Sequence, residues 1–175
     1  YGVKLESTVT PLERNRVAVD ITIAEGAVAK IKRINIVGNT SFEEEDLLDE
    51  FKLGTSAFLS RVTKNDQYSR QKLSADLEAL RSFYLDRGYI NFKVDSTQVS
   101  ISPDKNDIYI TINITEGDVF TISDIRLAGR LAVSKEQIFP LIHLSRGDRF
   151  SRKDVVGSSE RINNLLGKNG YAFAN

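Results

Sequence analysis

The sequence repeats itself with a spacing of 91 residues, and this repetition constrains the fold more than any other feature. The stretches DITIAEG and NINITEG end at Gly26 and Gly117, 91 residues apart, and Gly38 and Gly129 have the same spacing. Self-similarity at a fixed period indicates that one supersecondary unit occurs several times. We therefore expect tandem copies of a small unit rather than one continuous core.

The repetition also predicts where each copy begins and ends. A second correspondence aligns YGVKLEST, at the start of the chain, with NFKVDST in the middle copy. We predict that residues 1–26 are the C-terminal hairpin of a partial unit, that 27–117 form a complete unit, and that 118–175 are the N-terminal part (strand, helix, helix) of a further unit. Because the chain opens in mid-strand and contains no Met, we expect it to belong to a longer protein.

The first half of the complete unit is expected to be a strand followed by a helix. Residues 31–36 alternate between apolar and polar, as in a half-buried strand, and Gly38 supplies the turn. Ser41 and Glu44 have the spacing of a capping box, and Gly54 is a plausible helix stop.

The second half is expected to be a long helix and two strands. Apolar residues recur at helical spacing over 68–88, and strands are expected over 89–101 and 107–116. The fold class is therefore α+β, with a small three-stranded mixed sheet covered on one face by two antiparallel helices. The predicted core is Ile34, Ile36, Leu47, Leu48, Phe51, Leu73, Leu77, Leu80, Tyr84, Phe92, Ile110 and Ile112.

The last segment repeats the front half of the unit. A strand is expected over 122–127, and Ser134 with Gln137 has the spacing of a second capping box. Pro140 removes a hydrogen bond in the second turn, so this helix should be short or distorted. Ser151 is expected to cap the helix that follows.

The strand after the long helix changes its alternation along its length. Phe92 and Val94 share one parity, whereas Val99 and Ile101 share the other. These side chains can face one side of a sheet only if the pleat slips by one residue.

Comparison of the copies locates this slip. Aligned with residues 3–11, the middle copy contains one extra residue, Gln98, which predicts a β-bulge near Asp95–Gln98 in the middle unit only. Such a bulge either protects an exposed edge or re-aims an edge that receives a partner strand, and both interpretations stay open. The predicted partner-binding residues are Asn91, Phe92, Lys93, Val94, Asp95, Ser96, Thr97, Gln98, Val99 and Ser100.

Composition and spacing argue against several classes of function. The 24 basic and 24 acidic residues are interleaved, so no basic patch for nucleic acid is predicted. There is no Cys, and His143 has no partner at ligand spacing, so we predict no metal site and no cofactor. The acidic run at 43–46 is expected to stabilise a helix N-terminus. No nucleophile motif occurs, and we predict no enzymatic activity.

Several stretches carry a resemblance to a known family. FYLDRGY ends the long helix, GN follows the first strand and EG closes the unit. Together with VTPLERNRVAVDI and RGYINFKVDSTQVSISPDK, they make the chain similar to the POTRA (polypeptide-transport-associated) repeats of the BamA family of outer-membrane β-barrel assembly proteins. The chain resembles the end of the second repeat, the whole third and the front of the fourth, without the family's C-terminal membrane barrel.

This resemblance implies a non-enzymatic scaffold on the periplasmic side of the Gram-negative outer membrane. Implied partners are accessory lipoproteins, with a BamB-type β-propeller at the complete unit, and unfolded outer-membrane proteins bound by strand addition. Contact with the membrane would occur only through the barrel. POTRA units also occur in two-partner secretion transporters and cell-division proteins, which remain alternatives. An accessory domain of a periplasmic enzyme is a further alternative that convergent ionisable groups would favour.

The two incomplete segments complement each other. Residues 1–26 supply two strands without helices, and 118–175 supply a strand and two helices. If 1–175 is the whole chain, we predict a head-to-tail swapped oligomer in which the hairpin of one copy completes the last unit of another.

Overall fold

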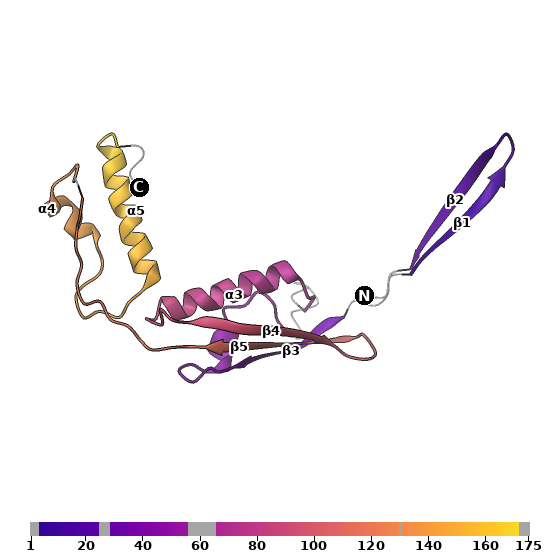
Figure 1. Cartoon of the computed structure of the whole chain (residues 1–175), viewed down its shortest axis with the longest axis horizontal. Coiled ribbons are helices and arrows are strands. Elements are labelled where there is room, and N and C mark those ends of the chain that lie inside the picture. Colours follow the sequence, from indigo (N-terminus) through magenta and orange to yellow (C-terminus); the bar gives the residue numbers. More distant parts are fainter. Residues whose placement is uncertain (1–3, 25–28, 56–65, 130, 172–175) are drawn as a thin grey trace.

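The computed structural model describes residues 4–24, 29–55, 66–129 and 131–171 (Figure 1). These residues form a two-stranded hairpin, a three-stranded sheet with helices, and a helical segment. The elements in chain order are β1 (Lys4–Leu12), β2 (Arg16–Ala24), β3 (Lys30–Val37), α1 (Glu44–Leu48), α3 (Arg70–Leu85), β4 (Lys93–Ile101), β5 (Asp107–Thr115), α4 (Lys135–Ile138), the 3-10 helix η1 (Phe139–Leu141) and α5 (Arg152–Lys168).

The central strand of the three-stranded sheet is β5, in the order β3-β5-β4. β3 pairs with it in parallel and β4 antiparallel, so the sheet is mixed. Ile108, Ile110 and Ile112 of β5 are almost completely buried, whereas Tyr109 on the opposite face is exposed. This alternation is what the sequence pattern predicted, and the α+β class is confirmed.

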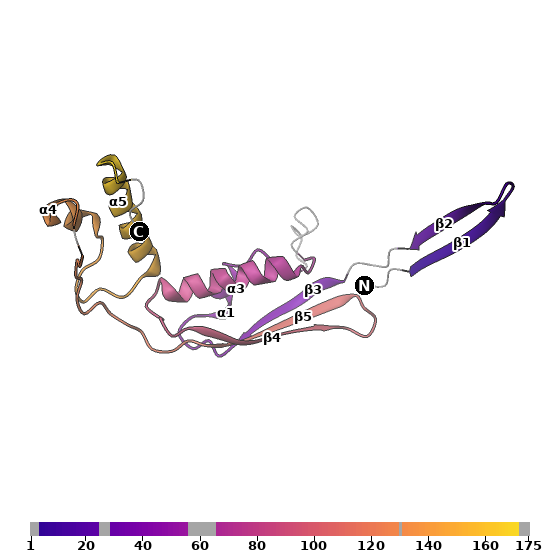
Figure 2. The same ribbon diagram turned by 45° about the horizontal axis from the view of Figure 1, so that its top comes forward.

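The helices of the complete unit lie on one face of this sheet (Figure 2). Ser69 caps the N-terminus of α3, and its side-chain oxygen accepts a hydrogen bond from the Lys72 N–H at 3.4 Å. After Leu85 the chain turns through Gly88, which has a φ of +94° that suits glycine. The long helix is therefore confirmed.

α1 is much shorter than expected, and the predicted capping box is wrong. It covers only Glu44–Leu48 and has no side-chain cap. The Ser41 hydroxyl donates instead to Glu116 Oε2 at 2.8 Å, and Glu44 Oε1 accepts from the Ile36 N–H at 2.7 Å. The side chains of Ser41 and Glu44 therefore bond to groups outside α1.

The predicted stop at Gly54 is also wrong. α1 ends at Leu48, and the backbone N–H groups of Lys52 and Leu53 donate to the carboxylate of Asp76 at 2.8 and 3.0 Å. Asp76 is buried on α3, so the segment after α1 is held against α3 as a loop.

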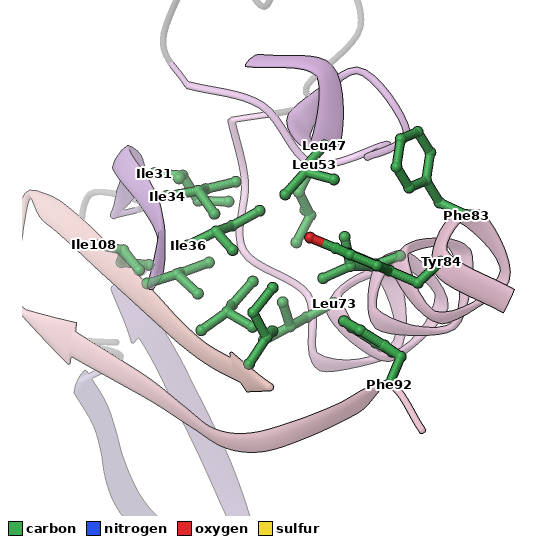
Figure 3. Close-up of a cluster of buried hydrophobic side chains, with 14 of the residues drawn as sticks. Ile31, Ile34, Ile36, Leu47, Leu53, Leu73, Phe83, Tyr84, Phe92 and Ile108 are labelled. Atoms are coloured by element: carbon green, nitrogen blue, oxygen red, sulfur yellow. The ribbon is translucent and has the colours of Figure 1, made fainter. Parts of the chain in front are cut away.

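A single apolar cluster fills the space between helices and sheet (Figure 3). Of the twelve predicted core residues, Leu48, Phe51 and Leu77 are only partly buried, and the other nine are buried. Two predicted core residues, Tyr84 and Phe92, stack with ring centroids 4.2 Å apart. The predicted core omitted three further rings that contact Tyr84 edge-on, namely Phe42, Phe83 and Tyr89.

The hairpin of β1 and β2 has a continuous register without a bulge, from Lys4–Ala24 to Leu12–Arg16. The predicted restriction of the bulge to the middle unit is therefore confirmed for these strands. One face of the hairpin is apolar, and each of its large side chains is at least 55% exposed. These residues are Leu5, Val9, Val17, Val19, Ile21 and Ile23.

In the last segment the predicted strand at 122–127 is wrong. Only an isolated bridge between Thr121 and Arg149 is present there, beside a hydrogen bond from the Ile122 N–H to the Asp148 carbonyl at 2.8 Å. β3, the corresponding strand of the complete unit, pairs with β5, and the described part of 118–171 contains no equivalent of β5.

The helices of the last segment follow the expectations in part. α4 has only four residues and passes into η1, which contains Pro140, so the predicted shortening is confirmed. Ser134 occupies the N-cap position without a side-chain hydrogen bond, so the second capping box is wrong. The Ser151 hydroxyl oxygen accepts from the Asp154 N–H at 3.2 Å, which confirms this cap.

The last segment rests on the end of α3. The Phe120 N–H donates to the Gly88 carbonyl at 2.9 Å, and the Lys153 N–H donates to Asp86 Oδ1 at 2.8 Å. A Cβ on Gly88 would lie 2.7 Å from Cγ of Arg149. Glycine is therefore required at this contact for space as well as for backbone conformation.

Candidate partner-binding edge strand

The predicted binding segment lies mostly on β4, an edge strand of the sheet. Residues 89–92 form a turn instead of the predicted start of the strand, because the Phe92 N–H donates to the Tyr89 carbonyl at 3.1 Å. Phe92 is 3% exposed and belongs to the core, whereas Asn91 is exposed in the turn. The remaining predicted residues, Lys93 to Ser100, lie on β4 itself.

The predicted bulge is present in β4 and is confirmed. The register shifts between Val94, which faces Ile114, and Ser96, which faces Asn113. The extra residue is therefore Asp95, within the predicted range, and not Gln98. After the bulge the parity of the strand is reversed, as the sequence comparison required.

Polar bonds on the face away from the helices hold this bulge. The Thr115 hydroxyl donates to Asp95 Oδ2 at 2.6 Å, and the Asn113 side-chain amide donates to the Ser96 hydroxyl oxygen at 2.9 Å. Lys93 lies 3.3 Å from the same Asp95 carboxylate. The hydrogen bond from Thr115 is the main reason that the pKa of Asp95 is lower than usual, with a smaller contribution from Lys93.

The bulge gives the edge an apolar side and a polar side. Thr97, Val99 and Ile101 pair with Ile112, Ile110 and Ile108, so they share the helix-covered face. On that face Thr97 is half-buried, but Val99 and Ile101 are 39% and 47% exposed. Gln98 and Ser100 point to the opposite face and are exposed. Ile101, which lies just outside the predicted segment, also belongs to the apolar side. Its position two residues after Val99 could have indicated this from the sequence.

The backbone of β4 is available on its outer side. The Lys30 N–H bonds toward β5, to the Asn106 carbonyl. The register of β3 shifts between Ile31 and Arg33, and after this shift the Ile36 N–H points away from the sheet, to Glu44. Successive N–H groups of a strand point to opposite sides. When this alternation is followed from β3 through β5 to β4, the N–H groups of Thr97 and Val99 point away from β5. Among the described residues, no backbone hydrogen bond outside the ladders is donated by a β4 N–H.

Glu116, at the end of β5, is a structural residue that the sequence reasoning missed. Its carboxylate, 6% exposed, accepts hydrogen bonds from the backbone N–H and hydroxyl groups of Thr40 and Ser41 and from the Tyr84 hydroxyl, at 2.7–3.2 Å. It therefore joins the end of β5 to the turn after β3 and to α3. The Glu-Gly pair that the sequence repeats at 116–117 could have pointed to the structural role of Glu116.

These contacts shift the pKa values of both Glu116 and Tyr84. Burial alone would raise the pKa of Glu116, but the hydrogen bonds from Thr40, Tyr84 and Ser41 outweigh it and lower this pKa to about 2. Burial and the negatively charged Glu116 raise the pKa of the Tyr84 phenol. The carboxylate is thus charged and the phenol protonated at neutral pH.

The remaining candidates for chemistry do not converge. In the described ranges, no cluster of three His, Asp or Glu side chains is arranged to hold a metal ion. Of the predicted acidic run at 43–46, Glu43 is at the N-cap of α1 and the other three acids lie in its first turn. His143 is exposed. Of the helices described, none is long and apolar enough to cross a membrane.

Comparisons with known proteins agree with this architecture. The sequence model of the POTRA family, described as surface antigen variable number repeat, matches residues 29–117 and 120–175. The outer membrane protein assembly factor BamA of Neisseria meningitidis serogroup B is 30% identical over 99% of this chain, and BamA of Buchnera aphidicola is 32% identical over 91%. The chain spans only 22% and 26% of the lengths of these relatives.

Solved structures show the same fold. The crystal structure of Haemophilus influenzae BamA POTRA3-5 has a TM-score of 0.67 at 24% identity, covering 82% of this chain and 56% of that one. BamA from Haemophilus ducreyi lacking POTRA domains 1-3 has a TM-score of 0.60 at 18% identity, covering 77% and 24% of the two chains. Because the family model matches most of the sequence, the chain belongs to the POTRA family.

Proposed function

We propose that this chain is a non-enzymatic periplasmic scaffold of an outer-membrane protein assembly factor, which binds partner proteins by adding their strands to β4. Similarity to two outer membrane protein assembly factors over at least 91% of this chain supports a role in this process. The open outer side of β4 supports the mode of binding, because an unpaired edge is a template for another strand. Implied partners are the accessory lipoproteins of the machinery and unfolded outer-membrane proteins.

The two sides of β4 define the kind of strand that fits. Main-chain hydrogen bonds would come from Thr97 and Val99, whose N–H groups point outward. A partner residue beside Val99 or Ile101 would cover exposed apolar surface next to the helices, whereas one beside Gln98 would stay in water. The preferred partner is therefore an extended segment that alternates apolar and polar residues.

A pair of lysine substitutions tests this mode of binding. Val99→Lys places a charge on the apolar side of the edge, and Gln98→Lys places the same charge next to it on the polar side. We expect Val99→Lys to weaken the binding of the accessory β-propeller lipoprotein, measured by calorimetry with purified proteins, at least about tenfold more than Gln98→Lys. Equal effects of the two substitutions would contradict strand addition on this face.

Thr97→Pro tests the backbone contribution separately. The substitution removes an N–H that points outward, whereas the N–H groups that bond to β5 remain. We therefore expect the chain to fold and to bind the lipoprotein more weakly. Unchanged circular dichroism serves as the control for folding. Undiminished binding by the folded variant would leave side-chain docking as the mode of recognition.

A further inference from the structure

The second edge of the sheet, β3, differs from β4 because groups of the same unit already occupy its outer side. At its start, the Ile31 N–H donates to the Asp66 carbonyl at 2.7 Å, and Gln67 forms an antiparallel bridge with Lys30. Lys30 Nζ also contacts the buried Asp66 carboxylate at 2.7 Å. Asp66 and Gln67 therefore take the place of a neighbouring strand at the start of β3.

Toward the other end of β3, a side chain takes the same role. Glu44 Oε1 accepts the hydrogen bond of the outward Ile36 N–H at 2.7 Å. An ionised carboxylate is an acceptor with no donor, and its bonds to N–H groups are stronger than those between neutral groups. Glu44 thus occupies the position that a carbonyl of an added strand would need.

Space alone does not exclude a partner from β3. A pocket of about 320 Å³ lies beside Ile34, between β3 and α1, and its lining includes Leu48 and Leu53. An apolar side chain of an added strand would find room and contacts there. What distinguishes the two edges is therefore the hydrogen bonding of the backbone.

We propose that Glu44 closes the β3 edge and so directs strand addition to β4. This inference rests on the proposed function, since it concerns which of the two edges takes the partner strand. Near the start of β3 the Asp66 carbonyl accepts the Ile31 N–H, and near its end the Glu44 carboxylate accepts the Ile36 N–H. At β4 an alternating extended segment then finds the successive outward N–H groups of Thr97 and Val99 without a bond among the described residues, whereas at β3 it meets N–H groups near both ends that are already bonded.

The experiment uses the ¹⁵N-labelled chain of residues 1–175 and a synthetic peptide as the probe. The peptide copies Arg16–Ala24 (RVAVDITIA), an alternating strand with one charge of each sign. Glu44→Ala removes the acceptor, Glu44→Gln keeps an acceptor oxygen without the charge, and Glu43→Ala removes an exposed neighbouring acid as the matched control. Peptide-induced shifts of backbone amide signals report which edge is used.

In the wild type, Glu44→Gln and Glu43→Ala, we expect shifts at Thr97 and Val99 but none at Ile34 and Ile36. In Glu44→Ala, Ile34 and Ile36 should shift as well. Exchange of the Ile36 amide with solvent should be at least about tenfold faster in this variant, because it has lost a hydrogen bond to a charged group. If Glu44→Ala does not fold, Glu44→Met keeps the length of the side chain without the acceptor and gives the same readout.

The possible outcomes separate the two claims. Shifts at Ile36 in the wild type would show that the edge is not closed, and shifts confined to β4 in Glu44→Ala would show that Glu44 does not close it. Either result overturns the inference and leaves strand addition at β4 standing. Absence of shifts at both edges of the wild type would overturn the proposed strand addition, and this inference with it.

Discussion

At the scale of single residues, Glu116 connects three parts of the unit that are distant in sequence. It accepts from Thr40 and Ser41 after β3 and from Tyr84 on α3, at the point where the chain leaves β5. A buried carboxylate is tolerated here because several donors replace the water that it loses. The residue therefore makes closure of the unit dependent on charge.

This dependence predicts how acid affects stability. The pKa of Glu116 falls from an ordinary 4.5 to about 2 in the folded chain, so the folded state binds fewer protons than the unfolded state between these values. The carboxylate should contribute on the order of 3 kcal/mol to the free energy of unfolding above about pH 5, and this contribution should disappear as the pH falls toward 2.

Urea unfolding of the wild type and Glu116→Gln between pH 7 and pH 2 measures the effect. The side-chain amide of the variant does not titrate, so the difference in stability between the two proteins should shrink as the pH falls. A difference that stays constant over this range would contradict the assigned role of Glu116.

At the scale of elements, α3 supplies much of the core through one face, but its leucines are not equivalent. Leu80 is completely buried, whereas Leu77 is only partly buried at the margin of the cluster. We expect Leu80→Ala to lower the free energy of unfolding by on the order of 2–5 kcal/mol, because it leaves a cavity. Leu77→Ala should cost less. Chemical denaturation of the two variants compares them directly, and a larger loss for Leu77→Ala would show that the helix is rotated from its described position.

The elements also show which features could be predicted from the sequence. The isoleucine alternation of β5 and the stripe of α3 are local patterns, and the structure contains both elements. The bulge was found because a second copy of the strand was available for comparison. Its position at Asp95 depends on a bond to Thr115 on the neighbouring strand, which no local pattern reveals.

The failures at α1 have a similar cause. Ser41 and Glu44 have the spacing of a capping box, but their partners, Glu116 and Ile36, lie outside the helix. A motif of four residues cannot show that a distant carboxylate or strand will compete for its side chains. The same holds for Asp76, whose place on the apolar face of α3 was visible although its acceptor role was not.

At the scale of the whole molecule, apolar side chains are exposed at both ends of the chain. The apolar face of the hairpin is exposed, and the described part of 118–171 contains helices without a sheet of their own. We still predict that 1–26 and 118–175 are parts of incomplete units, and that an isolated 1–175 chain associates head to tail through them. Light scattering should show a mass that rises with concentration, because covering each Val or Ile side chain contributes about 1.5–3 kcal/mol. A constant monomer mass up to millimolar concentration would contradict the swap.

The parallel pairing of β3 and β5 has a mechanical consequence. The chain enters the sheet at Lys30, where β3 begins, and leaves it at Thr115, where β5 ends. These points lie at opposite ends of two adjacent strands that share one ladder. Tension applied along the chain would therefore load this ladder in shear, so its hydrogen bonds would resist together instead of opening one after another. A unit connected in this way can carry a pulling force between its neighbours without being unzipped.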